Sequence, residues 1–361
     1  MTDYAAAGVD VDAGERAVAL MRESIRATQR PEVIGDIGGF AGLFDISVAR
    51  SMSRPVLATS TDGVGTKIAV ARAMNVHHTI GIDLVAMVID DLVVCGAEPL
   101  FMTDYIATGS VDPARIARIV AGIAEGCVQA GCTLIGGETA EHPGLMAPDE
   151  YDIAGAGVGI VDADAMLGPA RVQPGDAVIA MGSSGLHSNG YSLARMVLLG
   201  DSGPGLDGHV PEFTRTVGEE LLEPTRIYAQ DCLELTRACD VHAFSHVTGG
   251  GIAANLARVL PESLAVDIDR STWSLQGIFT SIARIGDVDR SDMEQAFNMG
   301  VGMLAVASSG DAEAAINLLR AHRISAWQCG VVRSRTAEDV GNATAKGGSG
   351  GAVMLRGEFA G

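Results

Sequence analysis

The stretch from Ala58 to Gly96, ATSTDGVGTKIAVARAMNVHHTIGIDLVAMVIDDLVVCG, decides the fold of the N-terminal half. It overlaps Pro55–Thr61, an apolar and then hydroxylated segment that predicts a strand, and Asp62 lies where this strand should end. A helical pattern begins near Ile68. A second helix, Gly81–Cys95, is apolar nearly all round, which predicts that it is buried. We therefore predict an α/β unit built around a buried helix.

Three carboxylates interrupt this apolar helix. Asp83 and Asp90 are seven residues apart and share almost the same face, and Asp91 lies one helical step round. Buried carboxylates persist when they bind a cation, a basic side chain or backbone donors; the alternative is that some cap the helix or face solvent. Asp91 lies deep in the apolar run, so together with Asp62 it predicts a divalent-metal site with the oxygen ligands that Mg²⁺ prefers.

Composition limits the classes of function. A chain of 361 residues predicts two domains, and 47% hydrophobic residues suffice for large cores. The formal net charge of −20 argues against nucleic acid and anionic membranes as partners. Aromatic residues make up only 4%, which disfavours stacking platforms for bases. A phosphorylated small substrate remains compatible, because helix N-termini, metals and local cations can hold phosphate.

The sequence predicts a cytoplasmic protein. It begins without the basic and apolar regions of a signal peptide, and it has no apolar run long enough to span a membrane. None of the six cysteines forms a CxxC pair, so we expect free and mostly buried thiols. Their positions are Cys95, Cys127, Cys132, Cys232, Cys239 and Cys329.

The N-terminal half contains two glycine-rich segments. Ile34–Phe44 follows a predicted helix over Ala13–Thr28, and it could be a lid over a ligand or a turn-rich pair of strands. Further on, a strand over Cys132–Ile135 should deliver Gly-Gly-Glu, placing Glu138 at a sheet edge. The remaining predicted elements of this half are a strand at Leu100–Ile106, a helix from Asp112 to Ala130 with Asp112 as N-cap and Gly131 as C-cap, and a strand at Tyr151–Val161.

A second domain is predicted from Val172 onward. Its expected strands are Ala177–Met181, Ala243–Thr248, Ala265–Ile268 and Asn298–Val306, and its expected helices are Tyr191–Leu199, Ile227–Cys239 and Ile252–Leu260. Each half is predicted to end in a strand with a Gly-Val-Gly core, which hints at two related units. We expect Ala337–Gly351, which is small, polar and glycine-rich, to be flexible.

Two loops of the second domain are candidates for phosphate binding. Ser183–Asn189 offers hydroxyl, imidazole and amide groups beside a helix start, and Thr248–Gly251 opens a helix whose first N–H groups would face an anion. Either loop could be no more than a turn or cap. His187 could be a general base, a phosphate donor or a structural hydrogen-bonding residue. The predicted substrate-binding residues are Ser184, His187, Ser188, Asn189, Thr248, Gly249, Gly250 and Gly251.

The turn after the first strand fits neither common nucleotide motif. Its Asp-Gly-Val-Gly-Thr-Lys (62–67) lacks the GxxxxGK[ST] spacing of a P-loop, and no GxGxxG follows a strand. It does resemble a motif of the aminoimidazole ribonucleotide synthetase (phosphoribosylformylglycinamidine cyclo-ligase) family. Further segments that resemble this family follow in the same order: 81–99, 136–141, 185–192, 246–251 and 297–303.

The resemblance implies a two-domain α/β (α+β) fold. Residues 1–171 would bind ATP and Mg²⁺ and pair with a second copy into a dimeric barrel, and residues 172–361 would form a second α/β domain. It also implies ATP-dependent cyclisation of formylglycinamidine ribonucleotide to aminoimidazole ribonucleotide in purine biosynthesis, in a cleft between the domains. Predicted catalytic residues are Lys67, His187 and Glu138; predicted ATP-binding residues are Gly38, Gly39, Asp62, Gly63, Gly65, Thr66 and Lys67; predicted metal ligands are Asp62 and Asp91.

The sequence departs from the family pattern at five positions: Asp90, Cys95, His142, Ala254 and Gln276 stand where the family usually has Asn, Gln, Met, Glu and Pro. Rival interpretations are another ATP-using member of the superfamily or an inactive nucleotide-binding scaffold. Selenophosphate synthetase would need a reactive cysteine or selenocysteine near the N-terminus, and no cysteine precedes Cys95.

Overall fold

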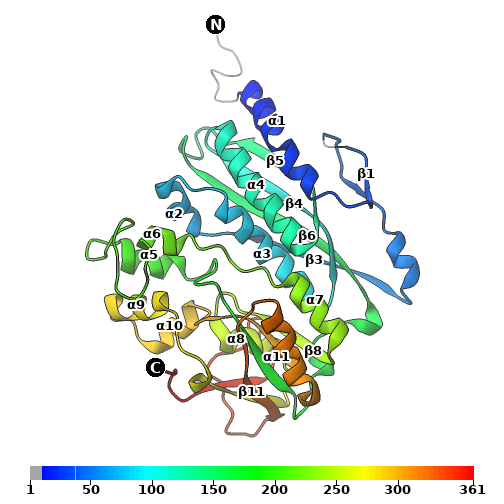
Figure 1. Ribbon diagram of the computed structural model, residues 1–361, viewed down its shortest axis with the longest axis vertical. Coiled ribbons are helices and arrows are strands. Elements are labelled where there is room, and N and C mark those ends of the chain that lie inside the picture. Colours follow the sequence, from blue (N-terminus) through cyan, green and yellow to red (C-terminus); the bar gives the residue numbers. More distant parts are fainter. Residues whose placement is uncertain (1–9, 37) are drawn as a thin grey trace. The chain divides into compact units, whose positions relative to one another are not determined.

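The computed structural model describes residues 10–36 and 38–361. The chain divides into two compact units: unit 1 contains residues 1–92 and 97–165, and unit 2 contains residues 93–96 and 166–361. Both are mixed α/β units, as Figure 1 shows. Within the described ranges, no helix is long and apolar enough to cross a membrane. The same residues contain free cysteines only, four of them buried, in agreement with the prediction of thiols.

Unit 1 is built on a four-stranded sheet. In spatial order its strands are β3 (Pro55–Gly63), β6 (Tyr151–Asp162), β4 (Glu98–Thr108) and β5 (Thr133–Glu141). Neighbours are antiparallel except β4 and β5, which run parallel. Its helices are α1 (Val11–Ala27), α2 (Lys67–Met74), α3 (Thr79–Val93) and α4 (Pro113–Ala130), and α1 packs on α4.

The parallel strands β4 and β5 need a crossover connection, which α4 provides. Both ends of α4 are well specified by the sequence. The Asp112 side chain accepts hydrogen bonds from the backbone amides of Ala114 (2.9 Å) and Arg115 (3.1 Å), and Gly131 ends the helix in the left-handed conformation. Both caps agree with the sequence prediction. The strand that follows is longer than predicted, since β5 continues through the Gly-Gly-Glu segment to Glu141.

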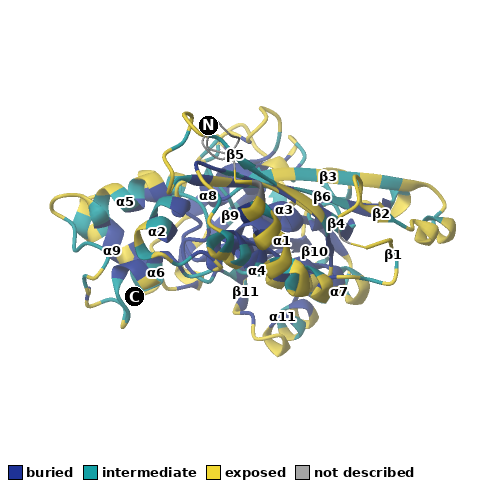
Figure 2. Cartoon of the chain, turned by 90° about the horizontal axis from the view of Figure 1, so that it is seen from above, coloured by how far each residue is buried: buried dark blue, intermediate teal, exposed yellow. Residues whose placement is uncertain are grey.

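One face of this sheet is open. Residues alternate between intermediate and exposed along β3, and Leu57 of β3 (61% exposed) and Tyr105 of β4 (43% exposed) are large side chains left uncovered. The exposed and intermediate colours along β3 in Figure 2 follow this alternation. On the other face, alternate residues of β4 such as Met102 and Ile106 are fully buried, as a sheet covered by helices on one side requires.

Unit 2 is built on a six-stranded sheet with a buried centre. Its strands are β12 (Ala352–Arg356), β9 (Leu264–Asp269), β11 (Ala326–Ser334), β7 (Ala177–Gly182), β10 (Val301–Ala307) and β8 (Val241–His246), in that spatial order. All neighbours are antiparallel except β12 and β9. Every residue of β8 and β10 is buried, which explains the continuous apolar character of β10, whereas β8 also buries His242, Ser245 and His246.

The helices of unit 2 largely match the predicted positions. They are α5 (Tyr191–Leu199), α6 (Val217–Leu221), α7 (Ala229–Ala238), α8 (Gly251–Arg258), α9 (Gly277–Gly286), α10 (Arg290–Ala296) and α11 (Ala312–Ala321). Short elements complete the chain: β1 (Val33–Ile34), β2 (Leu43–Phe44), and the 3-10 turns η1 (Ser47–Ser51), η2 (Ala163–Ala165), η3 (Pro169–Arg171), η4 (Arg270–Thr272) and η5 (Ser309–Asp311).

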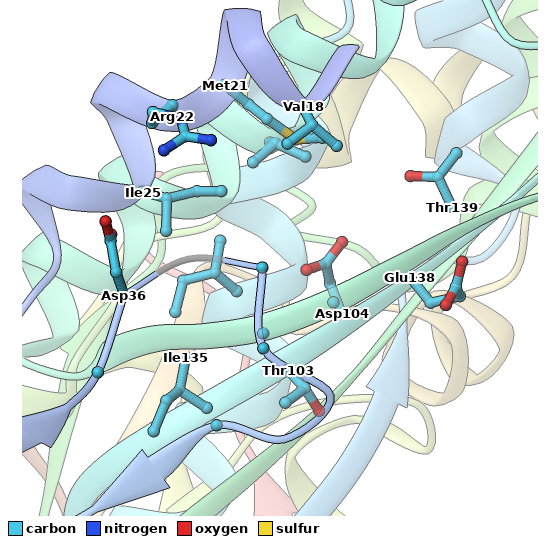
Figure 3. A pocket seen from close by; sticks show the side chains of 18 of the residues that line it. Val18, Met21, Arg22, Ile25, Asp36, Thr103, Asp104, Ile135, Glu138 and Thr139 are labelled. Atoms are coloured by element: carbon cyan, nitrogen blue, oxygen red, sulfur yellow. The ribbon is translucent and has the colours of Figure 1, made fainter. Parts of the chain in front are cut away.

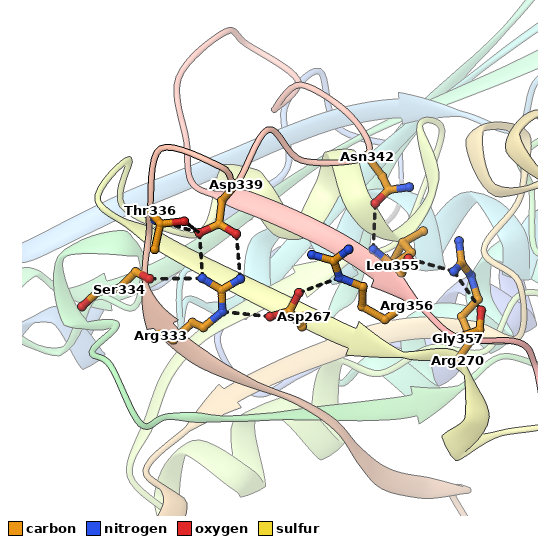
Figure 4. Close-up of polar contacts among 10 residues, drawn as sticks. All are labelled: Asp267, Arg270, Arg333, Ser334, Thr336, Asp339, Asn342, Leu355, Arg356 and Gly357. Atoms are coloured by element: carbon orange, nitrogen blue, oxygen red, sulfur yellow. Dashed lines mark hydrogen bonds and ion pairs between the residues drawn. The ribbon is translucent and has the colours of Figure 1, made fainter.

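The last strand is held by ion pairs at the sheet edge (Figure 4). Asp267 of β9 accepts from Arg333 Nε of β11 (2.8 Å) and from Arg356 Nε of β12 (2.9 Å), and Arg333 also forms two 2.7 Å bonds with Asp339. The Arg333 guanidinium holds the pKa of Asp339 well below its usual range. The segment 337–351 therefore contains an anchored residue, although it forms neither helix nor strand.

The predicted echo between the two halves is only local. β6 is the last strand of unit 1, whereas β10 lies inside the sheet of unit 2 and is followed by β11 and β12. β10 also begins at Val301, later than predicted, because Met299 and Gly300 both have positive φ and form a turn. A shared Gly-Val-Gly sequence therefore does not mark equivalent positions in the two units.

Candidate functional site

Unit 1 contains a cavity of about 910 Å³. It is enclosed by α1, by the glycine-rich segment between β1 and β2, and by the strands β4 and β5 (Figure 3). Three of the predicted site residues, Gly38, Gly39 and Glu138, line it together, although they are about one hundred positions apart in the chain. Its volume lies in the range of small-molecule sites.

The glycine-rich segment is a strand pair at its ends. Val33 pairs with Phe44 and Ile34 with Leu43, and the glycines between them border the cavity. A Cβ atom on Gly42 would lie 2.7 Å from Cγ1 of Ile135, so this glycine lets the segment approach β5. The prediction of a strand pair is correct for its ends, and closure of the segment over a ligand stays a prediction; Ile37 lies outside the described residues.

Sequence reasoning missed Asp104, which also lines the cavity. It lies in the middle of β4 between the fully buried Met102 and Ile106, and only 9% of its surface is exposed. Burial raises the pKa of this carboxyl to about 7. The sequence did contain a signal for Asp104. In a strand with alternating side chains, this acidic residue stands at a position that faces the core.

The turn after β3 positions a buried ion pair. Lys67 is the first residue of α2, and its Nζ lies 2.9 Å from the carboxylate of Asp83 on α3. Neither side chain has any exposed surface. Asp83 thus binds a basic side chain, one of the alternatives that the sequence left open. Asp62 is partly buried at the end of β3, where its Oδ1 accepts from the amide of Gly63 (2.7 Å), and Gly65 and Thr66 are exposed.

The acids of α3 differ from the prediction in one respect. Asp83 and Asp90, on the same face, are both fully buried, whereas Asp91 is exposed although it was expected deep in the apolar run. The single helical step between positions 90 and 91 turns the second carboxylate off the buried face. The described residues contain no group of three or more His, Cys, Asp or Glu side chains that could hold a metal ion. The pairing of Asp62 and Asp91 at Mg²⁺ stays a prediction.

In unit 2, His187 is buried in the loop that follows β7. Its Nε2 accepts from the backbone amide of Ser184 (3.2 Å), so the neutral imidazole carries its proton on Nδ1. Ser184 Oγ in turn donates to the carbonyl of Pro224 (2.6 Å). His187 has a positive φ of 62°, and its ring centroid lies 6.1 Å from that of Tyr228. The loop is thus a defined structure that holds the imidazole in one orientation.

The two predicted phosphate loops lie side by side. A Cβ atom on Gly249 would be 3.6 Å from Oδ1 of Asn189, and this carboxamide belongs to the other loop. Gly250 has φ +98° and is the N-cap of α8, so no side chain of the cap residue covers the first turn. Asn255 on α8 fixes the loop by donating to the carbonyls of Thr248 (3.2 Å), Gly249 (3.3 Å) and Gly251 (2.8 Å).

Three of the unusual residues have structural contacts. Gln276 Nε2 donates to the carbonyl of Ser183 (2.7 Å) and so braces the His187 loop. Ala254 lies next to the predicted phosphate loop, because a Cβ atom on Gly250 would be 3.1 Å from the Cβ of Ala254. His142 Nε2 lies 3.0 Å from the hydroxyl of Tyr105 on the open face of the unit 1 sheet.

Comparisons with known protein families assign both halves of the chain. Residues 44–161 match the N-terminal domain of AIR synthase related proteins, and residues 173–341 match the C-terminal domain of the same proteins. The phosphoribosylformylglycinamidine cyclo-ligase of Anaeromyxobacter sp. (strain Fw109-5) is 50% identical over 341 residues, which cover 93% of this chain and 97% of the relative. The cyclo-ligase of Bacillus cytotoxicus is 48% identical over 88% of this chain and 91% of its own length.

Solved structures with the same fold are more distant in sequence. Thiamine-monophosphate kinase from Stenotrophomonas maltophilia superposes with a TM-score of 0.65 at 19% identity, covering 94% of this chain and 97% of its own. The hydrogenase maturation protein HypE in complex with ATP gives 0.61 at 18% identity, with coverages of 89% and 86%. T. maritima PurL complexed with AMPPCP gives 0.54 at 15% identity, covering 96% of this chain and 49% of PurL.

Proposed function

Because the chain belongs to the AIR synthase family of phosphoribosylformylglycinamidine cyclo-ligases, we propose that its two units share the work of one ATP-dependent ring closure. Residues 1–171 bind ATP and residues 172–361 bind the sugar phosphate of formylglycinamidine ribonucleotide. The observation that carries the activity is the 50% identity to a cyclo-ligase along 93% of the chain. Identity to the thiamine-monophosphate kinase is only 19%, which disfavours that kinase's activity for this chain.

The reaction converts formylglycinamidine ribonucleotide and ATP into aminoimidazole ribonucleotide, ADP and phosphate. The formyl amide oxygen is a poor leaving group, so it is first phosphorylated. The amidine-side nitrogen then attacks that carbon, and phosphate leaves. Phosphoryl transfer of this kind depends mainly on positioning and charge stabilisation, which glycine-lined backbone and carboxylate-bound Mg²⁺ supply without a protein nucleophile.

For ATP, the cavity of unit 1 is the favoured site. Its glycine-rich border at Gly38 and Gly39 leaves backbone amides accessible, and Glu138 lies at its rim. Mg²⁺, which neutralises phosphate charge when bound, would be held by Asp62 and Asp91. Asp62 is partly buried and Asp91 is exposed, and carboxylate oxygens suit this ion. Lys67 contributes as the fixed partner of Asp83 at the base of the turn.

For the sugar phosphate, the paired loops of unit 2 are the favoured site. The backbone of α8 begins at Gly251 without a capping side chain, so the N-terminus of the helix dipole can favour an anion there, and Asn189 lies beside Gly249. The amides of Gly250 and Gly251 themselves donate to the carbonyls of Gln295 and Thr248 (both 3.1 Å), so the binding N–H groups would be those of the turn that follows. Ser188 Oγ lies 3.2 Å from Thr225 Oγ1, which keeps a hydroxyl pair next to this loop. His187 orients the loop through Ser184 and supplies an imidazole for proton transfer.

We also propose a cytoplasmic homodimer. Leu57 and Tyr105 are exposed on an open sheet face, and covering such a face with a second copy would bury apolar surface. Leu57→Lys should convert dimer to monomer in light scattering after size exclusion, whereas Leu145→Lys, at an exposed position outside the strands (82% exposed), should not. A wild-type chain that is monomeric at micromolar concentration would contradict this assembly.

A turnover assay tests the function as a whole. The chain should release ADP and phosphate only when formylglycinamidine ribonucleotide is present, and aminoimidazole ribonucleotide should accumulate in equal amount. ADP release without that substrate, or no product with it, would overturn the assignment. Gly249→Val tests the division of labour: it should raise the KM for the ribonucleotide far more than the KM for ATP. Gly249→Ala is the matched control, since its Cβ meets Asn189 only at 3.6 Å.

A further inference from the structure

The carboxyl group of Asp104 faces the cavity of unit 1. Figure 3 shows it between α1 and the strand pair β4–β5, pointing toward the space under Val18 and Ile25. The residue is 91% buried, since 9% of its surface is exposed. A Cβ atom on Gly137 would lie 2.1 Å from Asp104 Oδ1, so the bare backbone of β5 makes room for this carboxyl.

This carboxyl has no partner within residues 10–36 and 38–361 beyond its own backbone amide. No side chain there donates a hydrogen bond to it or forms an ion pair with it. An isolated buried carboxyl is unfavourable, and burial raises the pKa of Asp104 to about 7. A ligand that supplied the missing hydrogen bonds would remove this penalty, which no side chain of the described residues does.

The surroundings narrow the chemistry of that ligand. The walls near Asp104 are aliphatic, formed by Val18, Met21 and Ile25 on one side and Ile135 on the other. They suit a flat, weakly polar group. The titratable groups that line the cavity are mostly acidic, which disfavours a phosphate next to Asp104: Glu15 and Arg22 from α1, Asp36 from the glycine-rich segment, and Glu138 from β5. Cys127 of α4 does not line the cavity, but it interacts electrostatically with Asp104.

We propose that Asp104 binds the planar N–C–N edge of an amidine in the ligand, and so determines which ligand the cavity accepts. Two sources supply this chemistry. The N1–C6–N6 edge of adenine in ATP is a neutral amidine, and formylglycinamidine ribonucleotide carries a basic one. The inference rests on the proposed function. Adenine is favoured, because the glycine-rich border for phosphates belongs to the same cavity.

The two sources require different forms of Asp104. A neutral carboxyl offers one donor and one acceptor side by side, which match the adenine N1 acceptor and N6 donor. A cationic amidine instead pairs with the ionised carboxylate through two charge-assisted bonds. Asp104→Asn keeps a donor and an acceptor but never carries charge, and Asp104→Leu keeps neither. The two variants therefore separate the sources.

The test measures ATP binding by isothermal titration on the full chain at pH 6 and pH 8, alongside the KM of the ribonucleotide. If adenine is the ligand, Asp104→Leu weakens ATP binding about 10- to 100-fold. The ATP affinity of Asp104→Asn then stays within about 3-fold of the wild-type affinity at pH 6. Toward pH 8 the affinity of the wild type falls, whereas that of Asp104→Asn does not. If the substrate amidine is the ligand, ATP binding is unchanged and both variants raise the KM of the ribonucleotide at least about 10-fold.

Asp12→Asn, at an exposed carboxylate of α1 outside the cavity, is the matched control and should change neither quantity. Unchanged binding of both ligands by a folded Asp104→Leu chain would overturn the inference. If Asp104→Leu fails to fold, the near-isosteric Asp104→Asn serves as the test. The inference is then overturned if ATP binding by the wild type does not change between pH 6 and pH 8 and Asp104→Asn leaves the KM of the ribonucleotide unchanged. Wild-type turnover is measured separately, so loss of ATP binding in Asp104→Leu without product formation by wild type would refute only the proposed function.

Discussion

The two units bury charge in different ways. In unit 1 the ion pair Lys67–Asp83 has no exposed surface at all. Its counterpart in unit 2 is Arg270–Glu294, whose side chains keep 9% and 10% exposure and form 2.6 and 2.8 Å bonds at the edge of the unit. Asp104 adds to unit 1 a buried carboxyl that has no side-chain partner among residues 10–36 and 38–361. Unit 2 instead has neutral loops and a helix start at the phosphate site that we propose there.

This difference suggests that the two units would recognise a ligand in different ways, unit 1 through buried side chains and unit 2 through backbone. Fully buried charge is costly, and it persists where geometry is excellent or where function requires it. In unit 1, side chains within strands and helices are held by the core and can orient a ligand rigidly. In unit 2, the loop at Gly250 depends on backbone conformation, because Gly250 and Gly251 both have a positive φ that favours glycine.

The largest effect should come from Lys67→Met. It leaves the Asp83 carboxylate buried without its cation and should lower the free energy of unfolding by about 3–5 kcal/mol, measured by urea denaturation of the full chain. The double variant Lys67→Met/Asp83→Leu should recover most of this loss. Arg270→Met in unit 2 is the comparison, and it should cost less because water reaches that pair. An equal loss in both would remove the contrast between the units.

The second effect is a pH dependence of stability. Since the pKa of Asp104 is raised from 3.8 to about 7, the folded chain keeps a proton that the unfolded chain releases between these values. The stability that this proton contributes is fully present below about pH 4 and is lost as the pH rises to about 7. Above that pH the stability no longer changes through this group. Between pH 5 and pH 8 the wild type should therefore lose roughly 3 kcal/mol relative to Asp104→Asn. Parallel stability curves for the two chains would show that the carboxyl is paired.

A smaller effect is expected in unit 2 from Gly302→Ala. Its Cβ would lie 2.1 Å from the hydroxyl oxygen of Tyr228 and 2.4 Å from Cε1 of His187, so the His187 loop must move. Stability should fall by about 1–3 kcal/mol, and turnover should fall further because the imidazole is displaced. Gly310→Ala has space and serves as control. Full turnover in Gly302→Ala would mean that the position of His187 is not critical.

The smallest effects should be alike in the two units. Asp112→Ala removes the N-cap of α4 in unit 1, and Thr216→Ala removes the capping box of α6 in unit 2. Each should cost about 1 kcal/mol in denaturant midpoint experiments, because both caps satisfy amides at a helix start. A cap effect several-fold larger in one unit would show that the units differ in overall cooperativity and not only in how they bury charge.

The sequence predicted most elements because their signals are local. Asp112 and Gly131 correctly predicted the two ends of α4, and the apolar run of α3 correctly predicted a buried helix. Asp104 was not found, since its meaning depends on Gly137 of the next strand and on α1 above it. Asp91 was expected to be buried because a single helical step decides which of two adjacent acids faces the core.

The order of strands in unit 2 has a consequence for how the protein is made. The central strand β7 pairs with β10 and β11, which follow it by more than one hundred residues, and β9 is covered at its outer edge by β12. During translation β7 therefore leaves the ribosome long before its partner strands. Its apolar residues stay unpaired until β10 and β11 have been synthesised. A transcript cut before residue 352 would yield a chain with an uncovered β9 edge, the kind of surface that chaperones and proteases detect.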